Sequence, residues 1–235
     1  MSQYNKKNKR VKRNIIDKPD SEEPKQLIAN LLMDKLLDND EQELTHKQNK
    51  QVYIHENHIY YRTDVTIENV DLLLKLIREY KDTVHTIKSD PYCANYIPLP
   101  LYLHITSYGG DLYAGFLAYD YIKSSQLEII TIAEGYVASA GTLITVAGKT
   151  RLIQKSAIMM IHQLTTSMYG KFAELEEEFR NSTQDMQRLI KLYQSELNGK
   201  MTKNQIKEAL EHDYWWDSNE CIKKGLCEGL YLEGH

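Results

Sequence analysis

The spacing of apolar positions divides the first part of the chain into helical and extended segments. Residues 26–44 carry leucines at helical spacing, and residues 51–61 alternate loosely, which predicts a helix followed by one or two short strands. A turn is expected at Glu56. Helical spacing returns in residues 66–81, so a second helix is predicted there. The segment 82–100 is polar and contains three prolines, which favours a loop.

The middle of the chain repeats strand and helix in turn. Short apolar runs alternate with amphipathic ones, in the order strand 101–107, helix 111–123, strand 127–135, helix 139–147 and strand 157–163. This βαβαβ order implies a parallel sheet with crossover helices. We therefore expect an α/β fold in which the strands share one core.

The two ends of the chain differ in character. Residues 1–25 are basic with little apolar content, so we expect a disordered tail that cannot offset its ordering entropy by burial; a nucleic-acid or partner-binding arm is the alternative. Residues 26–235 are expected to form one domain. Within it, residues 170–198 predict one long helix, whose acidic first turns suit the positive end of a helix dipole.

Composition narrows the class of protein. The formal net charge of −4 gives no whole-protein case for nucleic-acid binding, and no apolar run approaches the roughly 20 residues of a membrane span. No hydrophobic stretch with a cleavage site follows the basic N-terminus, so no signal peptide is expected. The three cysteines lack metal-ligand spacing and are typical of reduced thiols. We expect a cytoplasmic protein without a bound metal.

The candidate catalytic residues lie where predicted strands end and predicted helices begin. Gly109 and Gly110 follow the first strand of the repeat, and glycines there let backbone N–H groups approach a ligand without a Cβ in the way. Ser139, within the small-residue stretch EGYVASAGTLI, follows the second strand, and His162 ends the third. A serine hydroxyl needs a base to take its proton, and a third group must orient that base. The alternatives are that Ser139 caps a helix and that His162 is structural.

Four motifs occur in an order that resembles the Clp protease proteolytic subunit (ClpP) family. They are SYGGDLYAGFLAYDYI, EGYVASAGTLITVAG, IMMIHQ and, after the long helix, ELNGKMTKNQIKEALEHDYWWDSNECIKKGL. The resemblance covers roughly residues 52–232. It implies a ClpP/crotonase-like α/β fold of stacked βαβ units with a protruding handle helix at residues 170–198.

The resemblance also implies a set of site residues. These are the nucleophile, base and acid of a triad and two oxyanion-hole donors: Ser139, His162, Asp213 and the backbone N–H groups of Gly110 and Ala140. Glu211 and Asp217 lie close enough in sequence to serve in place of Asp213. Tyr108 stands where the family has proline, which leaves the turn before Gly109 less pre-set and reshapes the substrate groove.

The function implied by the resemblance is that of an ATP-dependent Clp-type serine endopeptidase that hydrolyses unfolded proteins and peptides inside a chamber. It further implies a homo-oligomer of two stacked seven-membered rings joined by the handles, with an AAA+ unfoldase as partner. The sequence contains no nucleotide-binding glycine loop, so we expect no cofactor, with ATP used only by the partner. Membrane and nucleic-acid partners are not expected.

Three alternatives stay open at this point. A catalytically inert ClpP-like ring subunit would keep the fold and lose the triad. A capsid maturation protease of viral type would share the chemistry but work without an ATPase. A crotonase-type acyl-CoA enzyme would use the same glycine-rich oxyanion turn without a serine–histidine pair, and kinship of fold alone does not exclude it.

Overall fold

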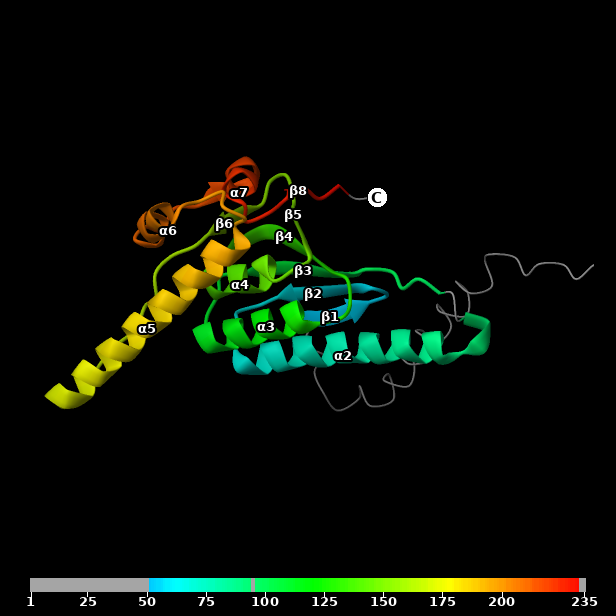
Figure 1. Ribbon diagram of the computed structural model, residues 1–235, viewed down its shortest axis with the longest axis horizontal. Coiled ribbons are helices and arrows are strands. Elements are labelled where there is room, and N and C mark those ends of the chain that lie inside the picture. The colour runs from blue at the N-terminus through cyan, green and yellow to red at the C-terminus, as the bar shows by residue number, and fades with distance from the viewer. Residues whose placement is uncertain (1–50, 94–95, 233–235) are drawn as a thin grey trace, which may run out of the picture.

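The computed structural model describes residues 51–93 and 96–232, which fold around one mostly parallel β-sheet (Figure 1). The main strand order is β1-β2-β3-β4-β5-β8, and β6 pairs with β4 and β7. The strands are β1 Val52–His55, β2 His58–Arg62, β3 Leu101–Ser107, β4 Ile129–Ala138, β5 Thr150–Ile153, β6 Ile158–Met160, β7 Trp216–Asp217 and β8 Gly229–Leu230. Only the β1–β2 and β6–β7 pairs are antiparallel within these ranges.

Helices cover one face of this sheet and project from one end of it. They are α2 Ile67–Ser89, α3 Leu112–Ser124, α4 Ala140–Val146, α5 Phe172–Glu196, α6 Lys203–Leu210 and α7 Ser218–Lys224, with a short 3₁₀ turn at Pro91–Cys93. In Figure 1, α2 and α3 run beneath the strands, and α5 extends away from them. None of the described helices combines the length and apolarity needed to cross a bilayer.

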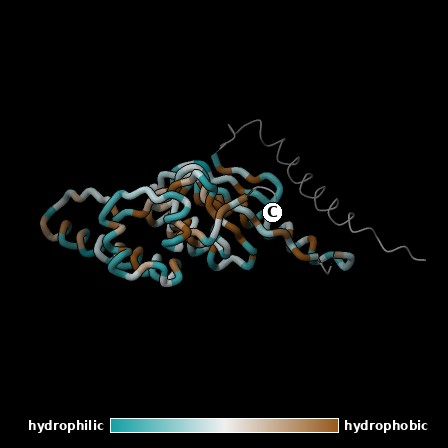
Figure 2. The backbone as a smooth tube through the Cα atoms, turned by 90° about the horizontal axis from the view of Figure 1, so that it is seen from above, coloured by the Kyte–Doolittle hydropathy of each residue, from teal (hydrophilic) through white to brown (hydrophobic). Residues whose placement is uncertain are grey.

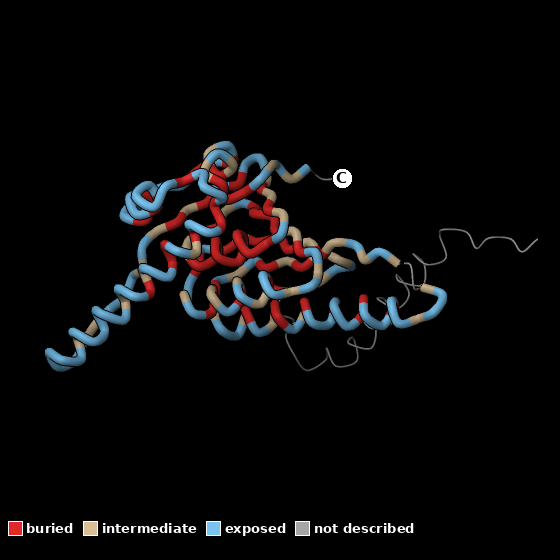
Figure 3. Tube along the Cα trace, in the orientation of Figure 1, coloured by how far each residue is buried: buried red, intermediate tan, exposed pale blue. Residues whose placement is uncertain are grey.

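The core forms because apolar and polar side chains alternate along the strands. In β3, Leu103 and Ile105 are fully buried toward the helices, whereas Tyr102 and Thr106 remain partly exposed on the other face. The hydropathy colouring of Figure 2 and the burial colouring of Figure 3 both concentrate the apolar, buried chain in the central strands. The sheet therefore has one apolar face and one more polar face.

The mixed α/β architecture confirms the predicted fold class, including the strand–helix–strand repeat. The predicted loop at 82–100 is wrong in its first half, because α2 continues to Ser89. Val84 and Ile87 extend its buried stripe, and the first proline comes only at position 91. The predicted helix at 26–44 and the tail at 1–25 lie outside the described residues.

The predicted end of the β4 strand at residue 135 is also wrong. β4 runs on to Ala138 because Gly135, with φ of 57°, bends the strand without ending it. Residues 130–133 pair with β5, and residues 136–138 pair with β6. This change of partner lets one strand serve two ladders and carries its second half up to Ser139.

The long helix predicted at 170–198 is confirmed as α5. All of its buried residues lie in the second half: Asp185, Leu189, Ile190, Tyr193 and Glu196. The first half buries no residue against the described part of the chain, and Figure 3 shows it as an exposed projection. Two large apolar side chains on it, Phe172 and Phe179, are 76% and 69% exposed.

Candidate active site

Ser139 lies in the turn between β4 and α4 with an unusual backbone. Its φ of 54° and ψ of −130° are rare for a residue with a side chain and typical of strained functional turns. It occupies the N-cap position of α4, yet its side chain makes no capping hydrogen bond. The structure therefore does not support the interpretation of Ser139 as a side-chain cap. Its hydroxyl is left without a partner among the described residues.

The Gly109-Gly110 turn lies directly against Ser139. Gly109 has φ of 97° and Gly110 has φ of 143°. A Cβ at position 109 would lie 2.5 Å from Ser139 Cβ and 2.9 Å from the Ala140 nitrogen. A Cβ at position 110 would lie 2.3 Å from the Val65 carbonyl oxygen. Only glycines allow the turn to close on the serine in this way.

Val65 holds the glycine turn from its other side. The Val65 N–H donates to the Gly109 carbonyl oxygen at 2.7 Å, and the Asp111 N–H donates to the Val65 carbonyl oxygen at 2.7 Å. Gly110 lies between these two contacts, and its own N–H donates to no atom of the described residues. The Ala140 N–H belongs to the first turn of α4, where intrahelical acceptors are missing. Neither predicted oxyanion donor has a hydrogen-bond acceptor among the described residues; Gly110 is exposed, whereas Ala140 is 4% exposed.

His162 follows β6, the strand that pairs with the second half of β4. Ala138 is the ladder partner of Met160, and the Ser139 N–H donates to the Met160 carbonyl oxygen at 2.9 Å. Parallel strands end at the same edge of a sheet, so Ser139 and the half-buried His162 both emerge there. The strand itself stops at Met160, three residues before the predicted end at residue 163. No hydrogen bond joins the two side chains in the described part of the chain.

Asp213 lies in the exposed loop between α6 and β7. The Gln163 N–H donates to the Leu210 carbonyl oxygen at 2.7 Å, which ties the segment after His162 to the end of α6. Since β7 pairs with β6, the far end of the loop is held on the same side. Within the described ranges, the Asp213 carboxylate does not contact His162, so the structure brings their segments together without forming the bond.

The two other candidate acids have different surroundings. Asp217 is the N-cap of α7, and its carboxylate accepts a hydrogen bond from the Glu220 N–H at 2.9 Å. That carboxylate already has a structural role. Glu211 is exposed at the C-terminal end of α6. These placements favour Asp213 over Asp217 as the partner of His162.

Aromatic residues beside the glycine turn were not predicted from the sequence. Tyr108 stacks on Tyr136 with ring centroids 4.1 Å apart and meets Trp215 edge-on at 6.5 Å. Each residue is a close sequence neighbour of a candidate site residue. The stack supports the chain before Gly109, where the resembling family has a proline. The sequence signals were Tyr108 in place of the family's proline and the 17 tyrosines of the chain.

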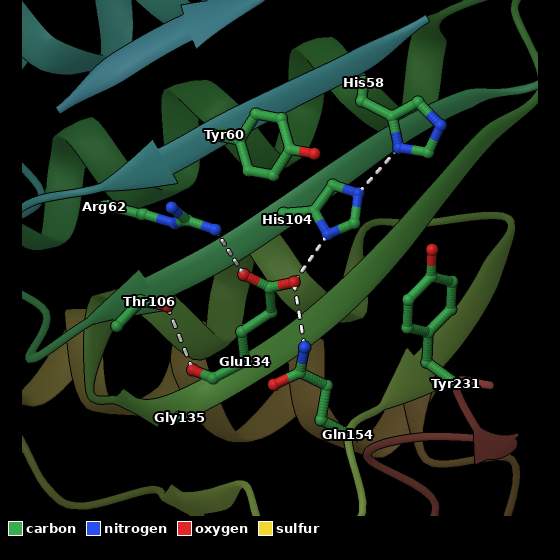
Figure 4. A pocket seen from close by; sticks show the side chains of 9 residues that line it. All are labelled: His58, Tyr60, Arg62, His104, Thr106, Glu134, Gly135, Gln154 and Tyr231. Atoms are coloured by element: carbon green, nitrogen blue, oxygen red, sulfur yellow. Dashed lines mark hydrogen bonds and ion pairs between the residues drawn. The ribbon is translucent and has the colours of Figure 1, made fainter. Parts of the chain in front are cut away.

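A polar hollow of about 600 Å³ opens on the sheet face away from α2 and α3 (Figure 4). Its walls come from β2, β3, β4, the end of β5 and the end of β8, and they are His58, Tyr60, Arg62, His104, Thr106, Glu134, Gly135, Gln154 and Tyr231. Alternating polar residues in these strands were its sequence signal. No group of three or more histidine, cysteine, aspartate or glutamate side chains in the described ranges could hold a metal ion.

The fold and the turn at Ser139 are those of an α/β protein with a candidate serine-hydrolase site. The Clp protease family model matches residues 97–232, more than half of the 235 residues. The chain therefore belongs to the Clp protease family, and the resemblance seen in its motifs is confirmed.

Relatives with this name are found in several bacteria. The chain is 31% identical over 133 residues to ATP-dependent Clp protease proteolytic subunit 2 of Treponema pallidum (strain Nichols), a match covering 56% of this chain and 66% of the relative. It is 30% identical over 135 residues to proteolytic subunit 1 of Chlamydia muridarum, covering 56% and 69%. It is 29% identical over 135 residues to proteolytic subunit 2 of Pseudomonas aeruginosa, covering 57% and 66%.

The matches thus span about two thirds of the length of these relatives. Their names support a Clp-type protease. They do not favour a capsid maturation protease, an inert ring subunit or an acyl-CoA enzyme.

The close approach at Gly109 generates a prediction. Gly109→Ala combines an unfavourable positive φ with a steric clash, whereas Gly199→Ala has a positive φ of 72° and open space around it. The Gly199 variant should lose about 1 kcal/mol of unfolding free energy from backbone strain alone. The Gly109 variant should lose clearly more, measured by urea unfolding at one protein concentration. Equal losses would show that the turn does not press against Ser139.

Proposed function

We propose that this protein is a Clp-type serine endopeptidase that hydrolyses peptide bonds of unfolded proteins, with Ser139 as its nucleophile. The observation that carries the proposal is the strained, uncapped Ser139 turn, whose hydroxyl has no partner among the described residues. The glycine turn lies against it and offers an open N–H at Gly110. A hydroxyl used only for packing would not need either feature.

The reaction is acyl transfer in two steps. The Ser139 oxygen attacks the carbonyl carbon of the peptide bond while His162 takes the hydroxyl proton. The Gly110 and Ala140 N–H groups donate hydrogen bonds to the oxygen that becomes negative, which is worth about 3–4 kcal/mol for each donor. The C–N bond then breaks as His162 returns its proton to the amine, and water releases the acyl group by the same route.

Asp213 has the role of orienting His162. Its carboxylate accepts the second imidazole N–H in the active form and stabilises the imidazolium that forms in the reaction. The absence of a hydrogen bond between Asp213 and His162 is compatible with this role, because catalytic hydrogen bonds are often long before substrate binds. The loop that carries Asp213 is anchored at both ends to the segments that flank His162.

The family membership and the projecting α5 support an oligomeric assembly. The exposed Phe172 and Phe179 give α5 an apolar surface that another copy of the chain would cover. We propose a homo-oligomer of two stacked seven-membered rings, with an AAA+ unfoldase that uses the ATP and delivers unfolded substrate. The peptidase itself would need no cofactor. The three cysteines are free thiols, in keeping with a cytoplasmic location.

A labelling experiment tests the nucleophile. A fluorophosphonate probe should modify the full-length protein at Ser139, and Ser139→Ala should abolish labelling and lower peptide turnover by roughly 10⁶-fold. Ser124→Ala is the matched control, because this exposed serine at the end of α3 lies outside the site and should change neither readout. Retained peptidase activity in Ser139→Ala would refute the assignment.

An added AAA+ unfoldase and ATP separate the two protease alternatives. A Clp-type subunit should then degrade a folded model protein, whereas a maturation protease should gain nothing from the ATPase. Absence of any serine labelling in the wild type would favour an inert subunit or an acyl-CoA enzyme.

The identity of the acid has its own test. Asp213→Asn keeps the shape of the side chain but removes its charge, so kcat should fall by about 10⁴-fold, as expected when the histidine loses its orienting carboxylate. Glu211→Gln, a matched change two residues away, should leave kcat within about twofold, the size of a surface substitution. Steady-state peptide hydrolysis measures both. A large loss in Glu211→Gln with little loss in Asp213→Asn would reverse the assignment.

A further inference from the structure

A buried carboxylate joins three strands and the residue that follows a fourth at the floor of the polar hollow (Figure 4). Glu134 in β4 accepts hydrogen bonds from Arg62 Nη2 of β2 at 3.1 Å and His104 Nδ1 of β3 at 2.7 Å. Gln154 Nε2, just after β5, donates to it at 3.1 Å. Glu134 is 8% exposed and His104 is 3% exposed. Burial by itself would raise the pKa of Glu134, but the bonds and charges of His104 and Arg62 outweigh it, so the pKa lies below its ordinary value.

Glu134 occupies the point where β4 changes its pairing partner. The strand pairs with β5 up to Ala133 and with β6 from Tyr136 onward. Its backbone is fixed at the bend as well, because the Thr106 hydroxyl donates to the Glu134 carbonyl oxygen at 3.1 Å. The part of β4 beyond the bend ends at Ser139. The direction in which Ser139 is presented therefore depends on how the bend is held.

The same carboxylate also supports the strands that hold the glycine turn. Arg62 lies three residues before Val65, whose backbone brackets Gly110. His104 lies in β3, which leads into Gly109. A group bonded at once to β2, β3 and β4 fixes their relative positions a few residues before all three reach the catalytic turn. This placement gives Glu134 a mechanical connection to both halves of the candidate active site.

A second histidine extends the network to the surface. His58 Nδ1 lies 2.8 Å from His104 Nε2. His104 Nδ1 donates to the Glu134 carboxylate, so in a neutral ring its Nε2 carries no proton and accepts a hydrogen bond from the His58 Nδ1–H. If both imidazoles are protonated, two donors face each other and the bond is lost. A proton on both rings therefore breaks the hydrogen bond between His58 and His104.

Several charged and titratable groups face His58. Glu56 and His55 lie on its own hairpin, His104 and Glu134 approach from β3 and β4, and Arg62 lies further along β2. The rings of Tyr60 and Tyr102 stack on His58, and Tyr231 lines the hollow. Burial first, and then the charge of His104, lower the pKa of His58. The fold thus favours the neutral form of this histidine.

We propose that Glu134 is a positioning residue for the Ser139 site and that double protonation of the His58–His104 pair weakens this positioning. The proposal rests on the proposed serine peptidase function. Glu134 touches no substrate; it acts by holding the bend of β4 and the strands around the glycine turn. Acidification removes the support that His58 gives to His104, so the site becomes less ordered as the second proton binds.

The first test follows the backbone and does not depend on catalysis. Hydrogen–deuterium exchange of the full-length protein should show faster exchange over residues 136–142 in Glu134→Gln than in the wild type. Lowering the pH from 7.5 to 5.5 should produce a similar change in the wild type, after correction for intrinsic exchange rates. That change should be smaller in His58→Gln, which cannot become charged. His85→Gln, an exposed histidine in α2, is the matched control and should follow the wild type.

The second test follows the chemistry. The rate of fluorophosphonate labelling at Ser139 should fall about 3- to 30-fold in Glu134→Gln, the usual range for coupling through a network. The ratio of the wild-type rate to the His58→Gln rate should fall as the pH drops below 6.5, because every pH-dependent step that does not involve His58 is common to both proteins. Arg62→Gln is the second variant, for use if Glu134→Gln fails to fold. It removes a single, partly exposed hydrogen-bond donor to Glu134, so it should lower the labelling rate to a smaller extent.

The outcomes separate this proposal from the function on which it rests. No labelling of wild-type Ser139 would overturn the proposed function, and the exchange data would still decide whether Glu134 orders residues 136–142. Labelling with unchanged exchange and rate in both Glu134→Gln and Arg62→Gln would overturn the positioning role alone. If the ratio of the wild-type labelling rate to the His58→Gln labelling rate does not vary with pH, the proposed effect of protonating the His58–His104 pair is overturned.

The lowered pKa of His58 also predicts how stability depends on pH. Below its ordinary value of 6.5, the unfolded chain binds more protons at this histidine than the folded chain, so stability falls as the pH falls. Glu134 adds a separate loss, which begins only below its ordinary value of 4.5. The urea midpoint should therefore drop between pH 7.5 and 5.5, and drop less in His58→Gln. Equal drops in the two proteins would contradict the lowered pKa of His58.

Discussion

The backbone of the Gly109-Gly110 turn approaches Ser139 so closely that no side chain fits between them, and the rest of the site depends on this contact. The contact places the Gly110 N–H, which lies in the turn after β3 and has no acceptor among the described residues, beside the end of β4. The positive φ of Ser139 costs of order 1–3 kcal/mol, which the surrounding structure must offset. The bond from Ser139 to Met160 contributes to this, as does α4, all of whose residues are buried.

One face of the sheet packs against helices, and the other face carries the hydrogen bonds that hold the bend of β4. Toward α2 and α3 it presents apolar side chains such as Leu103 and Ile105. On the opposite face it carries a charged group, Glu134, which is tolerated because each of its oxygens accepts hydrogen bonds from other strands. Apolar packing fixes the sheet without specifying one bend of β4, whereas a directional carboxylate can do so.

The sequence was sufficient to predict the elements whose pattern reflects the core. β3, α3 and α5 were placed correctly because their apolar periodicity is a direct consequence of burial. The end of β4 was misplaced because Glu134 and Gly135 look like a strand terminus, and only the ladder with β6 shows that the strand continues. The motif order located Ser139 and His162 at neighbouring strand ends. It could not show that Ser139 has an uncapped side chain, because that depends on backbone angles.

The polar network and the aromatic stack were beyond prediction for a different reason. Glu134 bonds to His104 and Arg62, which are 30 and 72 residues away along the chain, and no local pattern encodes such pairs. A charged residue inside the run ITIAEGYVA and the polar residues that alternate along the neighbouring strands were the only hints.

The central claim is that Ser139, His162 and the two backbone donors converge on one reacting centre. An experimentally determined structure of the fluorophosphonate-treated protein tests it most directly. The account predicts a phosphorus bonded to Ser139 Oγ, with one phosphoryl oxygen about 2.7–3.1 Å from both the Gly110 and Ala140 nitrogens, and the His162 imidazole within hydrogen-bond reach of Oγ. An adduct whose oxygen points away from both nitrogens, or an adduct on another residue, would contradict it.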